Sequence, residues 1–555
     1  MPAVLQGVGT GGGTVFGPVA RMAPAPVPPA PRTVPAAEAP AEAARVRAAL
    51  KGVAEALDQR AAATTGPAAE VLSAQVMMVA DPALADRAEA LVRDGADGPR
   101  ALTAAFGEFR AALGAAGGLF AERVADLDDL RDRAVARLLG LPMPGLPEPG
   151  HPYVLVAADL APADTALLDP AQVVALVTEQ GGPTSHTAIL ARSLGVPAVV
   201  GCVGAGALTD GQPVLVNGTD GTVEADPAPE AVAAAAAREE RHRRRAAGLT
   251  GPGRTADGHP VKLLVNLGAP HELQAAAAAD SEGVGLFRTE FLFLDRTEAP
   301  SVAEQTDAYA RVFAAFAGRR VIVRTLDAGA DKPLPFATAA DEQNPALGVR
   351  GLRTASRDPG LLDDQLLALA RAAGDSTAEV WVMAPMVSLP GEAADFAERV
   401  RAHGLPRAGA MVEVPAAALR ADGLARACDF LSIGTNDLSQ YAFAADRTLA
   451  SLAGLLDPWQ PALLDLVHLT ATAGARHDRP VGVCGEAAAD PALALVLTGL
   501  GVTSLSAAPA AVPDVRAALA AHPLADCRAL AELARTAPDA AAARARVRER
   551  LADRD

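Results

Sequence analysis

The second half of the chain alternates short apolar runs with stretches of helical length, and this alternation constrains the fold more than any other feature. Each of the first seven runs is followed by enough residues for a crossover connection. Eight such units over about 300 residues match a (β/α)8 TIM barrel. An open doubly wound sheet is the alternative, but no glycine-rich dinucleotide fingerprint supports it. The predicted strands are Val261–Asn266, Gly283–Arg288, Val321–Thr325, Val380–Pro385, Ala410–Pro415, Phe430–Thr435, Pro480–Cys484 and Thr503–Ser506.

Polar side chains stand where several of these predicted strands end. In a barrel the carboxyl ends of all strands meet on one face, which is where such folds carry out their chemistry. A single arginine there would also fit a salt bridge on the rim, whereas a set on successive strands indicates a site. The residues concerned are Arg288, Arg324, Glu413, Asn436, Asp437, Cys484 and Glu486.

The types of residue in this set suggest what the site binds. Glu413 and Asp437, on neighbouring strands, suit one hard divalent cation, with water and substrate oxygens as further ligands. Arg288 and Arg324, with Arg447 nearby in sequence, suit a small anion carrying several charges. A thiol beside such a cluster has its proton affinity tuned by the neighbouring cations.

A second candidate site lies in the first half of the chain. The apolar run Val173–Val177 predicts a buried strand, after which Gly181–Gly182 permit a sharp turn. Thr184 or Ser185 can cap a following helix, which places His186 in or next to its first turn. A helix start stabilises an anion, so an imidazole there suits transfer of a phosphoryl group. On spacing alone, a capped helix with an exposed histidine is an equal alternative.

The rest of the first half is organised by changes of composition. Residues 1–20 predict a strand pair or a strand-turn-strand unit at the edge of a domain, and the Pro/Ala stretch 23–40 predicts a linker. Residues 41–140 have helical periodicity typical of a small bundle. Strand signals return over 153–223, and the Ala/Arg-rich run 226–249 predicts a long exposed helix. The strands predicted between them are Tyr153–Ala158, Val173–Val177, Val196–Val200 and Val214–Val216.

Composition excludes several classes of protein. A chain of 555 residues implies two to four domains, and its net charge of −17 argues against a nucleic-acid binder. The four cysteines form no CxxC pattern and suit free thiols in a reducing cytosol. There is no basic, then apolar, amino-terminal signal and no run of about 18 apolar residues. We therefore expect a cytoplasmic protein without membrane insertion.

Seven motifs, in order along the chain, resemble those of the Enzyme I family of the phosphoenolpyruvate-dependent sugar phosphotransferase system. The resemblance covers essentially the whole chain. Pyruvate phosphate dikinase and phosphoenolpyruvate synthase share the histidine and barrel motifs, but they carry a large ATP-binding domain for which this chain has no room. The motifs are GGPTSHTAILARSLGVPAVVG (181–201), GVGLFRTEFLF (283–293), RTLDAGADKPLP (324–335), MVEVPAA (411–417), SIGTNDLSQY (432–441), DR (446–447) and VCGEAAAD (483–490).

The resemblance implies a reaction. Phosphoenolpyruvate would phosphorylate His186, which would pass the phosphoryl group to a histidine of the carrier protein HPr, with release of pyruvate. Arg288, Arg324 and Arg447 would hold the phosphate and carboxylate of the substrate. Asn436 would contact the substrate through its amide and backbone.

The resemblance also implies roles for five further side chains. Glu413 and Asp437 would bind Mg2+, with Asp437 at the substrate as well. Cys484 would protonate the enolate left after phosphoryl transfer. Thr165 would steady the active histidine through a hydrogen bond, and Lys332 would support the phosphate from a glycine-containing loop.

The same resemblance implies a division into domains. Residues 1–22 and 141–225 would form a swivelling β/α phosphohistidine domain, with a helical HPr-binding domain, 23–140, inserted in it. Residues 226–250 would be a linker helix. Residues 251–555 would form the phosphoenolpyruvate-binding TIM barrel, through which the protein would form a homodimer.

Some positions depart from the family pattern, and two other functions compete with the proposed one. Pro183 replaces a frequent arginine, and Thr448-Leu449 replaces the usual Gly-Asn, which leaves substrate affinity and loop dynamics open. A paralogue of the nitrogen-regulatory branch would use a different carrier, although the amino-terminal sensor domain usual in that branch is not expected here. A non-catalytic phosphoenolpyruvate sensor is the other candidate, and the joint presence of His186, Glu413, Asp437 and Cys484 speaks against it.

Overall fold

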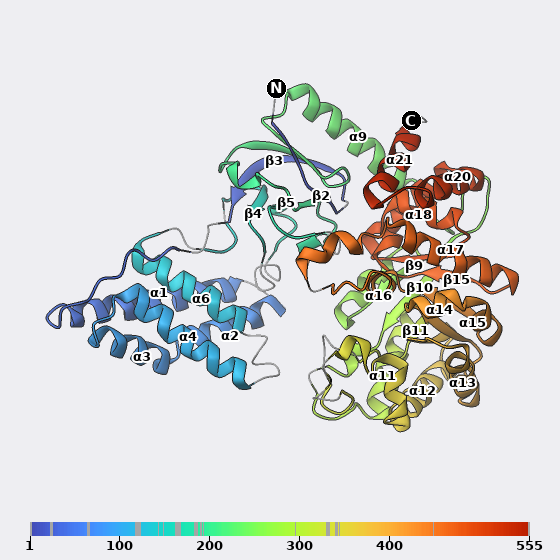
Figure 1. The fold of residues 1–555 in the computed structure, drawn as a ribbon, viewed down its shortest axis with the longest axis horizontal. Helices are drawn as coiled ribbons and strands as arrows, with labels where there is room; N and C mark the ends of the chain where they lie inside the picture. The colour runs from blue at the N-terminus through green and yellow to red at the C-terminus, as the bar shows by residue number, and fades with distance from the viewer. Residues whose placement is uncertain are drawn as a thin grey trace. The chain divides into compact units, whose positions relative to one another are not determined.

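The chain forms two compact units, Met1–Ala236 and Ala237–Asp555, and each is described by itself (Figure 1). The computed structural model describes all residues except 1–2, 11, 23–25, 64–66, 117–123, 142–143, 148, 161–167, 183–186, 189–190, 192–193, 295, 329–333, 339–341, 343, 448 and 553–555. No described helix is long and apolar enough to cross a membrane.

The first unit contains the predicted helical bundle. Its helices are α1 (Ala39–Ala63), α2 (Pro67–Val79), α3 (Pro82–Arg93), α4 (Gly98–Ala116) and α6 (Val124–Leu139). On α1, Val46, Leu50, Val53 and Leu57 recur at helical spacing and are all buried. They pack with Leu102 and other apolar side chains of α4 and α6 in one core cluster. The helical periodicity seen in the sequence is therefore the buried face of each helix.

An eight-stranded sheet forms the rest of the first unit, in the order β1-β8-β7-β3-β4-β5-β6-β2. The four strands predicted between 153 and 223 are confirmed as β4, β5, β6 and β7. The expectation that the amino-terminal strands lie at an edge is only partly right, because β3 pairs with both β7 and β4 inside the sheet. The strands are β1 (Val4–Gln6), β2 (Val8–Gly9), β3 (Thr14–Arg21), β4 (Tyr153–Ala157), β5 (Val173–Thr178), β6 (Ala198–Val200), β7 (Pro213–Asn217) and β8 (Thr222–Ala225).

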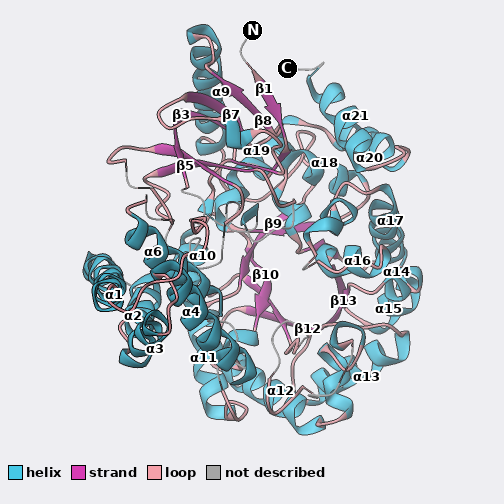
Figure 2. Ribbon diagram, turned by 60° about the vertical axis from the view of Figure 1, so that its left-hand side comes forward, coloured by secondary structure: helices cyan, strands magenta, loops and turns pink. Residues whose placement is uncertain are grey.

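The second unit contains the predicted barrel, which is closed and all-parallel. Figure 2 shows its strands in the middle and helices around them. Strand order follows the chain from β9 to β16, and β16 pairs with β9 to close the barrel. The strands are β9 (Lys262–Leu267), β10 (Gly283–Arg288), β11 (Arg320–Arg324), β12 (Glu379–Ala384), β13 (Ala408–Val412), β14 (Phe430–Ile433), β15 (Val481–Val483) and β16 (Ser504–Ala507).

Two barrel strands, β13 and β14, end two or more residues earlier than predicted. Strand β13 ends at Val412 because Pro415, whose ring restricts the backbone, begins helix α14. Strand β14 ends at Ile433 because helix α16 begins at Thr435. The polar residues that the sequence placed on these strand ends therefore stand just beyond the sheet, on the carboxyl-end face.

Helices surround the barrel, preceded by the helix α9 (Pro229–Ala247) that was predicted over 226–249. The others are α10 (Leu273–Ala278), α11 (Val302–Ala315), α12 (Pro359–Gly374), α13 (Pro390–Ala402), α14 (Pro415–Leu419), α15 (Ala421–Ala427), α16 (Thr435–Ala442), α17 (Pro461–Arg476), α18 (Pro491–Gly499), α19 (Val512–Ala521), α20 (Leu524–Arg535) and α21 (Ala540–Ala552).

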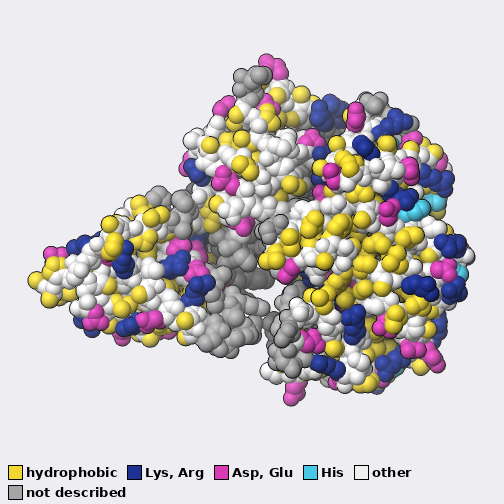
Figure 3. Space-filling model, in the orientation of Figure 1, with side chains coloured by type: hydrophobic (Ala, Val, Ile, Leu, Met, Phe, Trp, Pro, Cys, Tyr) yellow, Lys and Arg dark blue, Asp and Glu magenta, His cyan; other side chains and the backbone are white. Residues whose placement is uncertain are grey.

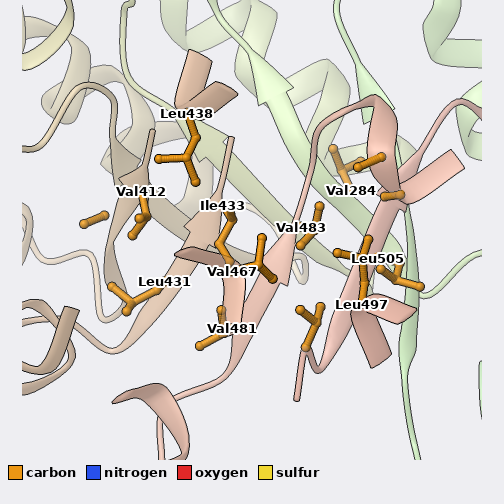
Figure 4. Close-up of a cluster of buried hydrophobic side chains, with 14 of the residues drawn as sticks. Val284, Val412, Leu431, Ile433, Leu438, Val467, Val481, Val483, Leu497 and Leu505 are labelled. Atoms are coloured by element: carbon orange, nitrogen blue, oxygen red, sulfur yellow. The ribbon is translucent and has the colours of Figure 1, made fainter. Parts of the chain in front are cut away.

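Side chains of the barrel strands alternate between two cores. On β14, Leu431 and Ile433 pack outward against helices, together with Val467 of α17 (Figure 4). Phe430 packs inward in a second cluster that fills the barrel, and Cys484 belongs to that inner cluster. The inner layer is dense, so glycines are needed where large side chains pass.

Gly409 tests this packing. A Cβ added at Gly409 of β13 would overlap the ring of Phe430, which is packed in the inner cluster. We expect Gly409→Ala to lower the free energy of unfolding by about 1–3 kcal/mol, the usual cost of overpacking, measured by chemical denaturation. Gly391→Ala on α13 is the control, since a Cβ there meets nothing within 4 Å. Equal stability of the two variants would contradict the packing described for the inner layer.

Candidate active site

The carboxyl-end face of the barrel collects most of the polar residues that the sequence singled out. Arg288 and Arg324 are the last residues of β10 and β11, and Glu413 directly follows β13. Asn436 and Asp437 stand in the first turn of α16, and Cys484 directly follows β15. Arg324, Glu413, Asp437 and Cys484 are buried, Asn436 and Arg447 are half-buried, and Arg288 is exposed. His186, Thr165 and Lys332 lie outside the described residues.

Arg324 is held by two carboxylates. Its Nη2 donates to Glu290 Oε1 at 2.8 Å, and its Nη1 lies 3.1 Å from Asp327 Oδ2. Burial acts to lower the pKa of Arg324, but Glu290 and Asp327 outweigh it and raise that pKa above its ordinary value. Among the described residues, the buried Nε of Arg324 has no hydrogen-bond partner. This cation is therefore permanently charged and keeps one donor for another group.

Arg350 is one of two residues of this cluster that sequence reasoning missed. Its Nε and Nη2 donate to the two oxygens of Asp327 at 3.1 and 2.9 Å. Its Nη1 donates to Asp437 Oδ1 at 2.9 Å and to Tyr441 Oη at 3.1 Å. Arg350 is buried and joins the β11 side of the face to the α16 side. It follows no strand, so the strand-end pattern that found the other residues does not reach it.

Asp327 was also missed, although it stands within the RTLDAGADKPLP motif. Burial acts to raise the pKa of Asp327, but Arg324 and Arg350 outweigh it and hold that pKa below its ordinary value. Asp327 therefore stays ionised between the two guanidinium groups. The sequence signal that would have found it is its position three residues after the strand-end Arg324.

Glu413 is a carboxylate for which the nearby positive charge does not offset burial and the neighbouring negative charges. Its Oε1 accepts the Met386 N–H at 2.6 Å, while its buried Oε2 has no hydrogen-bond partner among the described residues. Burial, followed by the charges of Asp437 and Asp327, raises the pKa of Glu413 to about 8. The donor, Met386, has φ +57, a strained value for a non-glycine residue that directs its N–H at this carboxylate.

These observations test whether a divalent cation fits the face. The described residues hold no group of three or more His, Cys, Asp or Glu side chains placed around one metal position. Glu413 and Asp437 nevertheless fit a hard cation, because the unpartnered Glu413 oxygen and the raised pKa both indicate missing positive charge. With only two protein carboxylates, water and substrate oxygens would complete the coordination.

The Cys484 thiol lies inside the barrel mouth. Ser432 Oγ donates to Cys484 Sγ at 3.4 Å, and Sγ lies 3.5 Å from the Ile433 carbonyl. Burial raises the pKa of the Cys484 thiol, and Glu413 also raises it, whereas Arg324 and Arg288 act to lower it. The thiol therefore stays protonated near neutral pH and can donate a proton.

The predicted histidine loop is described only in part. Strand β5 leads to Gly181, which has φ +93, so the predicted sharp turn is present up to Gly182. Thr187 and Ala188 are helical and buried, as expected for the start of the following helix. The position of the imidazole itself falls outside the described residues.

Comparison with known proteins decides the family. Three models of phosphoenolpyruvate-utilising enzymes match: the N-terminal model at residues 6–123, the mobile domain at 149–221 and the PEP-binding domain at 242–523. A relative in Streptomyces coelicolor, phosphoenolpyruvate-protein phosphotransferase, is 53% identical over 98% of both chains. The chain belongs to the phosphoenolpyruvate-protein phosphotransferase family. The resemblance drawn from the motifs is confirmed.

Other relatives of this family match over most of their length. The phosphoenolpyruvate-protein phosphotransferase of Haloferax volcanii is 42% identical over 84% of both chains. An NMR solution structure of Enzyme I (nEIt) aligns with 43% of this chain and 99% of its own, at 28% identity and a TM-score of 0.39. The matched PEP-binding model, residues 242–523, spans the site residues of this phosphotransferase barrel from Arg288 to Cys484.

Proposed function

We propose that this chain transfers the phosphoryl group of phosphoenolpyruvate to its own His186 and then to a histidine of HPr, releasing pyruvate. The observation that carries the proposal is the buried cluster of Arg324, Asp327, Arg350 and Asp437 beside Glu413, whose buried Oε2 has no hydrogen-bond partner among the described residues. In a family of phosphoenolpyruvate-utilising enzymes, this cluster suits an anionic substrate bound together with a cation.

The side chains on the carboxyl-end face of the barrel would have different roles in binding the substrate and the cation. Arg288, Arg324 and Arg447 hold the phosphate and carboxylate of the substrate, and the unpartnered Arg324 Nε offers one hydrogen bond to an anionic oxygen. Asn436, in the first turn of α16, adds an amide contact. Glu413 and Asp437 would hold Mg2+, which neutralises charge that develops on the substrate oxygens when it is bound.

In the transfer step, one bond to phosphorus forms as another breaks. The neutral His186 imidazole attacks phosphorus, so an N–P bond forms as the P–O bond to the enol oxygen breaks. The enolate takes a proton on carbon from the Cys484 thiol and leaves as pyruvate. The thiolate regains its proton from solvent. The phosphohistidine finally gives its phosphoryl group to the histidine of HPr.

The proposal also assigns a role to each part of the chain. Residues 1–22 and 141–225 would carry the histidine, and the bundle within 23–140 would dock HPr. The helix over 226–250 would link them to the dimerising barrel, residues 251–555, and the protein would act in the cytoplasm.

Figure 3 shows hydrophobic side chains gathered on the barrel where Figure 1 labels α16 and α17. Leu449 and Leu455, between α16 and α17, and Leu469, on α17, are exposed large apolar residues and suit contact with a second copy.

One labelling experiment tests the function. The protein is incubated with phosphoenolpyruvate labelled with ³²P in the phosphate, with Mg2+ or with a chelator. We expect acid-labile, base-stable label on the protein, an equal amount of pyruvate, and no label with the chelator. Added HPr should then take up the label. A sensor would bind phosphoenolpyruvate without taking up phosphate, and a nitrogen-branch paralogue would label the carrier of that branch in preference to HPr.

Cys484→Ala tests the proposed proton donor. We expect pyruvate formation to slow about 10²-fold or more, the usual contribution of a general acid, measured as the pre-steady-state rate with saturating HPr. Cys428→Ala is the matched control, since Cys428 is equally buried but lies in the core outside the barrel. An unchanged rate for Cys484→Ala would move the proton-donor role to another group.

A further inference from the structure

A chain of buried polar side chains lies behind the strand ends that carry Arg288 and Arg324. It consists of Gln305 and Tyr309 on α11, Gln365 on α12, and Thr289 directly after β10. All four are at most 1% exposed. Polar groups are costly to bury unless their hydrogen bonds are satisfied. Four buried polar side chains in contact are therefore expected to serve a structural or functional role.

Gln365 is the centre of the chain. Its Oε1 accepts the Leu326 N–H at 2.9 Å, and its Nε2 donates to Thr289 Oγ1 at 3.1 Å and to Tyr309 Oη at 3.0 Å. The Leu326 N–H requires an acceptor, which settles the orientation of the amide. All these bonds are consistent in direction, so both ends of the Gln365 amide are in use.

The chain of hydrogen bonds continues in two directions from Gln365. Thr289 Oγ1 donates to the Arg324 carbonyl at 3.0 Å, which brings it to the proposed substrate site. On the other side, Tyr309 Oη donates to Gln305 Oε1 at 3.1 Å, and Gln305 Nε2 donates to the Pro300 carbonyl at 2.9 Å. One end of this chain of hydrogen bonds therefore meets the site, and the other ends at the Pro300 carbonyl, just before α11.

After β11, side chains replace the neighbouring strand as hydrogen-bond acceptors for the backbone N–H groups. Thr325 N–H still donates to the Met383 carbonyl of β12, at 3.0 Å. The next two amides donate to side chains instead: Leu326 to Gln365, and Asp327 to Glu290 Oε1 at 3.1 Å. Past the last sheet hydrogen bond, the segment that leads from Arg324 to Asp327 is held by Gln365 on one side and Glu290 on the other.

We propose that Gln365 is a positioning residue for phosphoenolpyruvate turnover. By holding Leu326 N–H directly and the Arg324 carbonyl through Thr289, it aims Arg324 and Asp327 into the site. Asp327 in turn orients Arg350 through two hydrogen bonds. Gln365 itself touches neither substrate nor cation. Its role in turnover rests on the proposed function, whereas its hold on the backbone does not.

Two matched variants separate positioning from mere stability. Gln365→Met keeps the length of the side chain but loses its bonds to Leu326 and Thr289. Gln305→Met removes an equally buried amide at the far end of the same chain and leaves those bonds intact. Thr289→Val and Thr289→Ser form a second pair, because only serine keeps the hydroxyl that donates to the Arg324 carbonyl.

Hydrogen–deuterium exchange of residues 324–328 is measured first, in the full-length protein without substrate. We expect exchange at Leu326 to rise about tenfold or more in Gln365→Met and to stay unchanged in Gln305→Met, since one buried hydrogen bond is lost. Unchanged exchange at 324–328 in Gln365→Met would overturn the proposal whatever the substrate proves to be.

Turnover is measured next, as the KM for phosphoenolpyruvate and the kcat of HPr phosphorylation well below each melting temperature. We expect kcat/KM to fall about tenfold or more in Gln365→Met and Thr289→Val, with recovery in Thr289→Ser and no loss in Gln305→Met. Equal losses in Gln305→Met and Gln365→Met would make the chain purely structural. If the wild type takes up no phosphate, the proposed function fails, while the exchange result still decides whether Gln365 holds the backbone. Should Gln365→Met not fold, the Thr289 pair carries the same test.

Discussion

The His186→Ala variant is expected to take up no acid-labile phosphate from phosphoenolpyruvate, against one phosphoryl group per chain in the wild type. An alanine has no nitrogen to form the N–P bond, and no neighbouring residue in the 181–192 motif carries an imidazole. Transfer to HPr should be lost with it, because the carrier receives its phosphoryl group from this histidine. The measurement is ³²P retained on the denatured protein after incubation with labelled substrate and Mg2+.

His151→Ala is the matched control for this loss. His151 is an exposed histidine of the first unit, just before β4, and its removal should leave labelling unchanged. His186→Ala should still bind phosphoenolpyruvate, since the proposed substrate site lies entirely in the barrel, and calorimetric titration measures that binding. Label persisting in His186→Ala would reject the assignment of the phosphoryl acceptor, and loss of label in His151→Ala would reassign it.

Arg350→Met is expected to damage both stability and turnover. Methionine cannot replace the donors that Arg350 directs at Asp327 and Asp437. Removing one partner from a buried ion-pair network costs about 3–5 kcal/mol, because carboxylates are left buried without their cation. We expect a loss of that size in the free energy of unfolding, with kcat/KM for phosphoenolpyruvate lower by about 10²–10³-fold. Denaturant titration and initial rates of pyruvate release measure the two effects.

Arg350→Lys sharpens the interpretation. A lysine keeps the charge but lacks the planar fork that contacts Asp327 twice and Asp437 at the same time, so we expect part of the stability to return without the activity. Arg353→Met is the control, because Arg353 bonds the Gly348 carbonyl and Ser388 Oγ and contacts none of the site carboxylates. Full activity in Arg350→Met would show that the substrate site does not depend on this network.

Much of the barrel site could be predicted from the sequence because a barrel brings the residues that follow successive strands close together. Apolar runs separated by crossover segments can bury both faces only in a parallel sheet, and a closed barrel brings every strand's carboxyl end to one face. Arg324, Glu413, Asp437 and Cys484 were therefore found from their positions after strands, before any contact was known. The family motifs then suggested their roles, and those roles await the experiments above.

The residues that were not predicted come from places where sequence order says little about neighbours. Arg350 lies in a loop between β11 and α12, and Gln365 points from a helix outside the barrel. Nothing in the local pattern distinguishes either from an ordinary surface arginine or a helix glutamine. Their partners stand 23 to 91 residues away along the chain, so only packing decides them.

The sequence by itself determined the alternation of strands and helices, the barrel and the bundle, because hydrophobic period and turn residues act over a few positions. Only the tertiary structure decided that β3 runs inside its sheet, that Arg350 joins Asp327 to Asp437, and that one Glu413 oxygen has no hydrogen-bond partner within the described part of the chain. Strand pairing and buried charge depend on which distant groups share a small volume, and that follows from the closed fold as a whole.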